Sequence, residues 1–185
     1  NEPDYGHLFT FMDCACEVKA DELMQPKIEA EIAFILGEDM PDRDVTAQDV
    51  LLATEAVCAA FEIVDSRVAN WKIKLADTIS DNASSGRYVL GTKRISPAGI
   101  DLAKVTMTTE KAGEGVISEG DGSAVMGDPT VSVAWLANCM RRYGVSLKKG
   151  EVVLSGAFAA APPAKKGDVF TATFSILGSV TARFV

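Results

Sequence analysis

An alternating segment that turns fully apolar stands out in the first third of the chain. Polar and apolar residues alternate from Lys27 to Ile32, and the segment then stays apolar until Gly37. A period of two is typical of a strand with one open face, whereas a continuous apolar run is typical of a strand buried on both faces. The pattern therefore predicts a strand over 27–36 that runs from an open cleft into a core.

A helix and a second strand are expected next. Thr46-Ala47-Gln48-Asp49 resembles a capping box with Asp in the usual place of Glu, and apolar residues follow it at helical spacing. The expected buried stripe is Val50, Leu51, Thr54, Val57 and Cys58. These signals predict a helix over 47–60, followed by a strand over 61–66 that carries Glu62 among apolar residues.

The rest of the chain contains short strand patterns and one further helix signal. Asp128-Pro129-Thr130 marks a helix start, and Gly144 is the expected residue just past its end. Segment 71–75 is either a short strand or the entry to a loop. Further strands are expected over 87–91, 105–111, 115–119, 151–158, 168–176 and 179–185. Short strands close in sequence, with two separated main helices, predict a β-rich α+β domain.

Composition and charge narrow the class of partner. The 185 residues are 48% apolar and 24% charged, which is typical of a folded globular domain. The formal net charge is −8, and residues 1–50 hold 13 acidic and three basic residues. We expect no nucleic acid partner, because phosphate binding requires a basic patch. The acidic charge of residues 1–50 is compatible with a divalent cation.

Neither a membrane span nor a zinc site is predicted. No apolar run reaches the roughly 18 residues of a span, and Asn1-Glu2-Pro3-Asp4 lacks the features of a secretory signal. The four cysteines and the single His7 lack zinc-ligand spacing. We therefore expect no membrane association and a cytoplasmic location with reduced thiols.

Two carboxylates share one face of the predicted strand 27–36. Glu29 and Glu31 are two positions apart, and Ala33 and Ile35 continue their face as an apolar floor. Like charges beside apolar surface disfavour each other's ionisation, and a divalent cation such as Mg²⁺, Mn²⁺ or Ca²⁺ removes that cost. The alternative is an edge strand with a solvated acidic face.

Glu62 adds a third acid inside an apolar strand. Buried glutamates are rare unless they are paired or ligate a metal. We expect Lys27 and Arg67 on the opposite faces of their strands, so no basic partner is predicted beside the acids. Glu29, Glu31 and Glu62 are thus interpreted as one metal site, provided that the two strands pair.

These segments resemble the 2-keto-4-pentenoate hydratases of the fumarylacetoacetate hydrolase superfamily, from Glu2 to the C-terminus. The motifs that carry the resemblance are Glu2-Pro3-Asp4-Tyr5-Gly6, Gln25-Pro26-Lys27-Ile28-Glu29-Ala30-Glu31-Ile32-Ala33-Phe34, Glu62-Ile63-Val64-Asp65-Ser66-Arg67, Trp71-Lys72-Ile73-Lys74, Asp81-Asn82-Ala83-Ser84-Ser85-Gly86, Val133-Ala134-Trp135-Leu136-Ala137-Asn138 and Leu177-Gly178-Ser179-Val180-Thr181-Ala182-Arg183-Phe184. The six blocks from Gln25 onward, matching in the same order, make this a specific signal.

The resemblance implies a mixed β-sandwich or roll around a Mg²⁺ or Mn²⁺ site. The family's metal ligands correspond to Glu29, Glu31 and Glu62, and its active-site Asp and Ser correspond to Asp4 and Ser84. Asn82 and Arg87 are assigned as substrate-binding residues. The segment 81–85 is either an anion-binding turn of hydroxyl and backbone N–H groups or an ordinary turn.

The implied reaction adds water to 2-hydroxypenta-2,4-dienoate and gives 4-hydroxy-2-oxopentanoate, in the catabolism of aromatic compounds. The alternative is 4-oxalocrotonate decarboxylase, a relative with the same acidic triad. Arg87 and the segment 159–162 favour the decarboxylase, whereas 71–74 and 25–26 favour the hydratase. A third alternative is an inactive, metal-binding partner subunit.

Residues 1–185 are expected to form a single catalytic domain. The family's N-terminal helical region carries a Gly-x-Lys-x-Gly-Leu-Thr motif with an active-site Lys, and no segment here matches it. That difference bears on activity more than on metal binding, since the acidic ligands are present. We also expect a homo-oligomer, from Trp135 and the apolar C-terminal strand, and association with a pathway partner enzyme.

Overall fold

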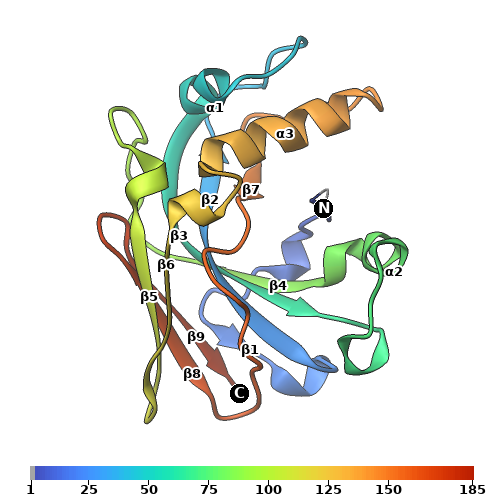
Figure 1. The fold of residues 1–185 in the computed structure, drawn as a ribbon, viewed down its shortest axis with the longest axis vertical. Helices are drawn as coiled ribbons and strands as arrows, with labels where there is room; N and C mark the ends of the chain where they lie inside the picture. The colour runs from blue at the N-terminus through green and yellow to red at the C-terminus, as the bar shows by residue number, and fades with distance from the viewer. Residues whose placement is uncertain (1–2) are drawn as a thin grey trace.

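The computed structural model describes residues 3–185, so that Asn1 and Glu2, where the resemblance begins, lie outside the described part (Figure 1). The α-helices are α1 (Ala47–Ala53), α2 (Leu75–Ser80) and α3 (Pro129–Arg141). The strands are β1 (Glu17–Val18), β2 (Pro26–Leu36), β3 (Thr54–Asp65), β4 (Ser85–Leu90), β5 (Thr106–Lys111), β6 (Gly115–Asp121), β7 (Val152–Leu154), β8 (Val169–Phe174) and β9 (Gly178–Phe184). None of the helices within 3–185 has the length and apolarity needed to cross a membrane.

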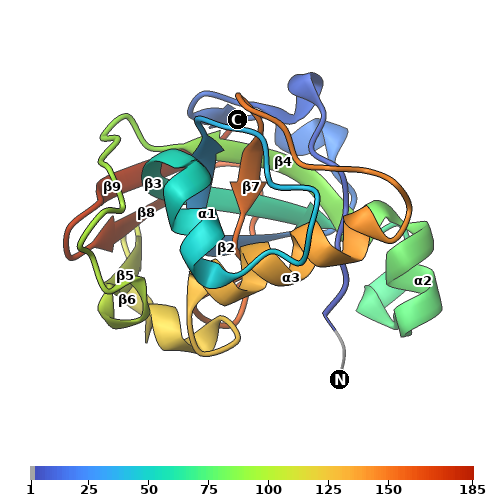
Figure 2. The ribbon, with the colours of Figure 1, turned by 90° about the horizontal axis from the view of Figure 1, so that it is seen from above.

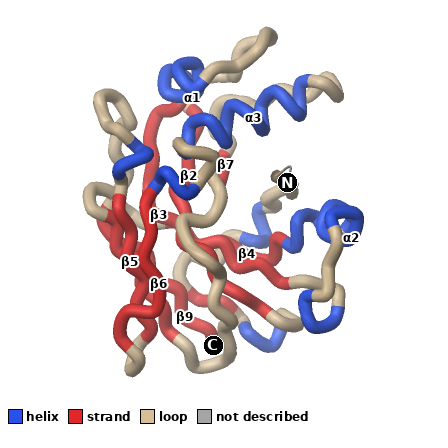
Figure 3. Tube along the Cα trace, in the orientation of Figure 1, coloured by secondary structure: helices blue, strands red, loops and turns tan. Residues whose placement is uncertain are grey.

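The strands form two sheets, and the predicted β-rich α+β class is confirmed. One sheet has the order β4-β3-β2-β7 and is antiparallel, whereas the other has the order β1-β9-β8-β5-β6 and contains one parallel pair, β1 with β9. The strands fill the left and lower part of the view, whereas α1 and α3 lie across its top and α2 lies at the right, near β4 (Figure 3). Strand β3 contacts both β8 and β9, which places the two sheets against each other.

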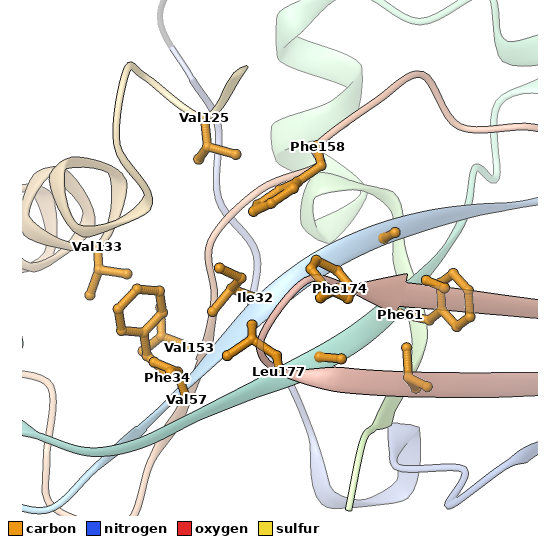
Figure 4. Packing of buried hydrophobic residues seen from close by; sticks show 14 of the residues in the cluster. Ile32, Phe34, Val57, Phe61, Val125, Val133, Val153, Phe158, Phe174 and Leu177 are labelled. Atoms are coloured by element: carbon orange, nitrogen blue, oxygen red, sulfur yellow. The ribbon is translucent and has the colours of Figure 1, made fainter. Parts of the chain in front are cut away.

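Strands β2 and β3 carry the site because their two faces have different surroundings. Ile28, Ala30, Ile32 and Phe34 of β2 point into the main core, which joins this sheet to the second sheet and to the apolar sides of α1 and α3 (Figure 4). The alternate residues Glu29 and Glu31, with the small apolar cluster Ala33, Ile35, Cys58 and Ala60, face the other way. The predicted strand with a polar end and an apolar end is therefore confirmed.

The helix predicted over 47–60 is wrong in its second half. The capping box forms as expected, since the Thr46 hydroxyl accepts from the Asp49 N–H, but α1 ends at Ala53 and Thr54 is already extended. Residues from Thr54 onward belong to β3 and pair with β2 along nearly its whole length. A strand buried on both faces has a continuous apolar sequence, which also satisfies helical spacing.

Other differences are local. Segment 71–75 is a loop entry and not a strand, and it leads into α2, an additional short helix that begins at Leu75. The strand expected over 151–158 shortens to β7. The predicted hairpin forms as β5 and β6, and the second helix forms as α3 with an Asp128 cap. Val180, Ala182 and Phe184 of β9 are buried within this chain, so the C-terminal strand does not supply the exposed apolar surface from which we expected an oligomer.

Candidate metal centre

The three predicted ligands converge on one point. Glu29 and Glu62 are direct partners in the β2–β3 register, and Glu31 follows Glu29 on the same face. One carboxylate oxygen from each of the three residues can be chosen such that all lie within 4.8 Å of one another. This confirms the pairing on which the prediction depended, and it excludes the alternative of a solvated edge, since β2 and β3 are the two inner strands of their sheet.

Two groups that sequence reasoning missed hold these carboxylates. The Ser85 hydroxyl donates to Glu62 Oε1 at 2.6 Å, and the Gly156 N–H donates to Glu31 Oε2 at 2.7 Å. Gly156 has a φ of +107°, a conformation that glycine adopts without steric cost. Each bond uses one oxygen, so the second oxygen of Glu31 and of Glu62 is available to a cation.

The site concentrates negative charge in a buried place. Burial, together with the neighbouring Glu62, raises the pKa of Glu29 to about 7 against the opposing charge of Lys27. Burial raises the pKa of Glu31 well above its usual range, with Glu62 and Glu29 adding to the effect. Burial also raises the pKa of Glu62, which the Ser85 hydrogen bond partly offsets. Three carboxylates that repel one another are suitable ligands for a hard divalent cation, which prefers oxygen ligands and neutralises their charge.

Lys27 corrects one expectation from sequence. It lies two residues before Glu29 and therefore on the same face, and not on the opposite one, and its charge lowers the pKa of Glu29. Its Nζ lies 4.2 Å from the centre of the Trp71 ring. One positive charge beside three carboxylates leaves the cluster negative.

We predict that metal-free protein loses stability as pH rises from about 5 to 7.5. In the unfolded chain Glu29 and Glu31 release their protons near the ordinary glutamate pKa of 4.5, whereas in the folded state they retain them to higher pH. The unfolded state is therefore stabilised by ionisation in this window, and the protein becomes less stable. A shift to about 7 corresponds to about 3 kcal/mol for Glu29 alone. Asp49, whose pKa the neighbouring Arg43 lowers, titrates below this window.

Urea unfolding at several pH values, with EDTA or with Mg²⁺, measures this effect. Saturating Mg²⁺ should remove the loss, because cation binding favours the ionised carboxylates. A metal-free unfolding free energy that stays level or rises between pH 5 and 7.5 would contradict the arrangement.

The carboxylates lie in a cleft of about 700 Å³. Its walls come from the N-terminal arm (Pro3–Thr10), from the segment after α2 and from α3, and both views place the arm between α2 and α3 (Figures 1 and 2). Trp71 and Trp135 are aromatic lining residues that sequence reasoning had not assigned to the site. The cleft is large enough for a small organic acid beside an ion.

Asp4 and Ser84 both line this cleft with the three glutamates. Asp4 is exposed, and its Oδ2 accepts from the Thr78 hydroxyl at 2.6 Å. Ser84 is buried, and its hydroxyl donates to Asp81 Oδ2 at 2.9 Å. The structure therefore places the expected active-site residues, Asp4 and Ser84, in the same cleft as the three expected metal ligands.

Asn82 and Arg87 have other partners. Asn82 bonds the backbone of His7 on the arm. Arg87 donates to Glu22 Oε2 at 2.9 Å, and its neighbour Tyr88 lines the cleft in its place, because adjacent strand residues face opposite ways. The structure does not bring Arg87 together with the other assigned residues.

We predict that Ser85→Ala weakens divalent metal binding by about 10–100-fold, the usual cost of removing a hydrogen bond to a ligand. The substitution leaves Glu62 in place but removes the donor that orients it. Mn²⁺ titration by calorimetry measures the affinity. Ser80→Ala is a matched control, since Ser80 is exposed and its hydroxyl bonds the Ala76 carbonyl of its own helix; equal affinity in the two variants would refute the positioning role of Ser85.

The chain is similar to several known proteins. Residues 15–185 match the family model described as the fumarylacetoacetate (FAA) hydrolase C-terminal domain. The whole chain is 47% identical to a 2-keto-4-pentenoate hydratase of Paraburkholderia xenovorans (strain LB400), of which it covers 69%. It is 45% identical to a 2-hydroxyhexa-2,4-dienoate hydratase of Comamonas testosteroni, of which it covers 71%.

A solved structure resembles the fold closely. The 4-oxalocrotonate decarboxylase from Pseudomonas putida G7, complexed with magnesium and adipate, superposes with a TM-score of 0.92 at 35% identity, over 97% of this chain and 69% of that one. The same enzyme complexed with calcium and acetate gives a TM-score of 0.90 at 34% identity, over 97% and 68%.

Proposed function

The chain belongs to the fumarylacetoacetate hydrolase family, and from this premise we propose that it is a divalent-metal-dependent hydratase of 2-hydroxypenta-2,4-dienoate. The observation that carries the proposal is the convergence of Glu29, Glu31 and Glu62 in a cleft that Asp4 and Ser84 also line. Hydratases are the curated relatives at 45–47% identity, over the full length of this chain.

Glu29, Glu31 and Glu62 would hold the cation, which we propose to be Mg²⁺ or Mn²⁺. When bound, such an ion supplies a Lewis acid that favours negative charge on the 2-oxo oxygen of the substrate. The carboxylates also exclude anionic groups from the floor of the cleft unless a cation is present. Binding of the anionic substrate therefore depends on the cation, because both the floor of the cleft and the chain as a whole are negative without it.

Asp4 is proposed to move protons. Hydration forms a C–O bond between water and C4, removes one proton from that water and adds one proton to C3, after the dienol has lost its hydroxyl proton and gained a proton at C5. A carboxylate at the rim of the cleft, held by the Thr78 hydroxyl, is suited to accept or donate these protons. Ser84 would accept a hydrogen bond from the attacking water or from the enol hydroxyl of the substrate, because its own proton is donated to Asp81.

The second candidate is decarboxylation of 4-oxalocrotonate, which the close likeness to the Pseudomonas putida G7 enzyme supports. It is the weaker candidate, because identity to that enzyme is 35% against 45–47% to hydratases. Arg87, one of the residues that favoured the decarboxylase, pairs with Glu22 and does not line the cleft.

A pair of assays separates the candidates. The protein is offered 2-hydroxypenta-2,4-dienoate and 4-oxalocrotonate in separate reactions with Mg²⁺, and products are followed by NMR and by CO₂ release. We expect loss of the dienol with formation of 4-hydroxy-2-oxopentanoate. Release of CO₂ alone would support the decarboxylase, and metal binding without turnover of either compound would support an inactive partner subunit.

We further predict a homo-oligomer in the cytoplasm, with a pathway enzyme as an associate in the cell. Trp135 supports this less than we expected, because it lines the cleft and contacts Tyr5. Light scattering at micromolar concentration measures the mass, and a monomer would refute the oligomer.

A further inference from the structure

The side-chain amide of Asn82 ties the N-terminal arm to the wall of the cleft. The His7 N–H donates to Asn82 Oδ1 at 2.7 Å, and Asn82 Nδ2 donates to the His7 carbonyl at 3.0 Å. Both functional ends of the amide are thus used on the backbone of one residue, 75 positions away in sequence. Such a reciprocal pair fixes the position and the direction of the arm at His7.

The arm fits closely around this point. A Cβ on Gly6 would lie 2.2 Å from the Asn82 carbonyl oxygen, so only glycine permits the approach. Two residues earlier, Asp4 accepts from Thr78. Between them, the Tyr5 ring meets Trp135 of α3 edge-on, with the ring centres 6.1 Å apart. The arm therefore contacts both α3, through Tyr5, and the α2 side of the cleft, through Asp4 and His7, and Asn82 is one of its fixed points.

The turn that presents Asn82 has an uncommon backbone conformation that side-chain bonds support. Asn82, Ala83 and Ser84 have φ values of +58°, +54° and +56°, which is costly for residues other than glycine and requires support from their surroundings. Asp81 gives that support, since it pairs with Arg67 and accepts from the Ser84 hydroxyl. The same turn leads into Ser85, which bonds Glu62. One short segment thereby holds both the arm and Glu62.

We propose that Asn82 is a positioning residue, which places Asp4 over the acidic cluster by clamping the arm at His7. This inference rests on the proposed function for its kinetic consequence, but the clamp itself does not. It differs from the assignment of Asn82 as a substrate-binding residue. Removing a group that binds substrate directly would raise KM, whereas displacing an acid–base group lowers kcat.

Asn82→Gly is the cleanest test, because it removes the side-chain amide while glycine adopts the left-handed backbone without steric cost. Asn138→Ala is a matched control: Asn138 makes the same reciprocal pair with the backbone of Val45, at 2.8 and 2.9 Å, but holds the loop before α1. Hydrogen exchange of the wild-type protein and of both variants measures directly whether the His7 amide is held. We expect the His7 amide to lose protection in Asn82→Gly and to keep it in Asn138→Ala.

Steady-state kinetics measure how the loss of the clamp affects catalysis. In Asn82→Gly we expect kcat for dienoate hydration to fall about 100-fold, as misplacement by about 1 Å does, with KM within about threefold and Mn²⁺ affinity within about twofold of wild type. In an Asp4→Asn background the same substitution should have no further effect, because its action passes through Asp4.

Each outcome is decisive. Unchanged exchange at His7 in Asn82→Gly overturns the clamp. Loss of protection with unchanged kcat, with a raised KM alone, or with effects that add to those of Asp4→Asn overturns the positioning role. If wild type does not hydrate the dienoate, the proposed function fails, whereas the exchange result still decides whether Asn82 holds the arm.

Discussion

Replacing Glu31 by Gln is expected to lower the affinity for Mg²⁺ and Mn²⁺ by more than the roughly 10–100-fold that an indirect contact costs. Glu31 is buried at 1% exposure and sits between the other two carboxylates and the Gly156 N–H. Gln keeps the shape and can still accept from Gly156, but it removes one negative charge and one good oxygen ligand. Turnover should recover in part at high Mg²⁺, because mass action restores occupancy.

The same substitution should raise the stability of metal-free protein. It replaces an acid that burial and the repulsion of Glu62 and Glu29 keep protonated in the folded state, at pH values where the unfolded chain ionises it at no such cost. For a domain of this size, each kcal/mol gained corresponds to about 2–4 °C in Tm. A variant that is more stable without metal and weaker with it is the signature of a ligand and not of a structural residue.

Calorimetric titration measures the metal affinity, and thermal unfolding with EDTA measures the stability of the metal-free protein. Glu38→Gln is the control, since Glu38 is exposed and its substitution removes the same charge outside the cleft. Wild-type metal affinity in Glu31→Gln would show that Glu31 is not a ligand.

Replacing Asp4 by Asn is expected to lower turnover by about 10²–10⁴-fold, the range for loss of a general acid or base. Asn can still accept from the Thr78 hydroxyl, so the arm keeps its anchor while the proton carrier is lost. Extra Mg²⁺ should not restore activity, because Asp4 is proposed as a proton carrier and not as a ligand. Rates measured across a Mg²⁺ titration therefore separate Asp4 from Glu31.

Asp13→Asn serves as the control for charge, because Asp13 is exposed and lies outside the cleft. Full activity of Asp4→Asn would remove Asp4 from the mechanism. Activity that returns at high Mg²⁺ would instead reassign Asp4 to the metal site.

The strand that carries Glu29 and Glu31 was predictable because its two faces differ. Alternation placed both carboxylates on one side and the apolar floor of Ala33 and Ile35 beyond them, as the structure has it. Strand β3 was only half predictable. Its residues from Thr54 to Ala60 are apolar on both faces except near the start, and such a run does not distinguish a strand from a helix.

The sequence predicts the metal ligands better than it predicts the groups that orient them. A charge inside an apolar strand is visible in the sequence, and Glu62 was found in that way. The Gly156 N–H has no side-chain signature, and Ser85 was indistinguishable from Ser84 until the β3–β4 pairing placed its hydroxyl on Glu62. Asn82 was assigned from the motif, but its bonds to His7 depend on a contact between distant segments.

The most direct test of the account is the position of Mn²⁺ in crystals of this protein, determined by anomalous diffraction. We predict one peak between Glu29, Glu31 and Glu62, with carboxylate oxygens from all three at about 2.0–2.6 Å. An anomalous peak elsewhere in the chain, or a cleft without Mn²⁺ at saturating concentration and with the three carboxylates turned apart, would contradict the account.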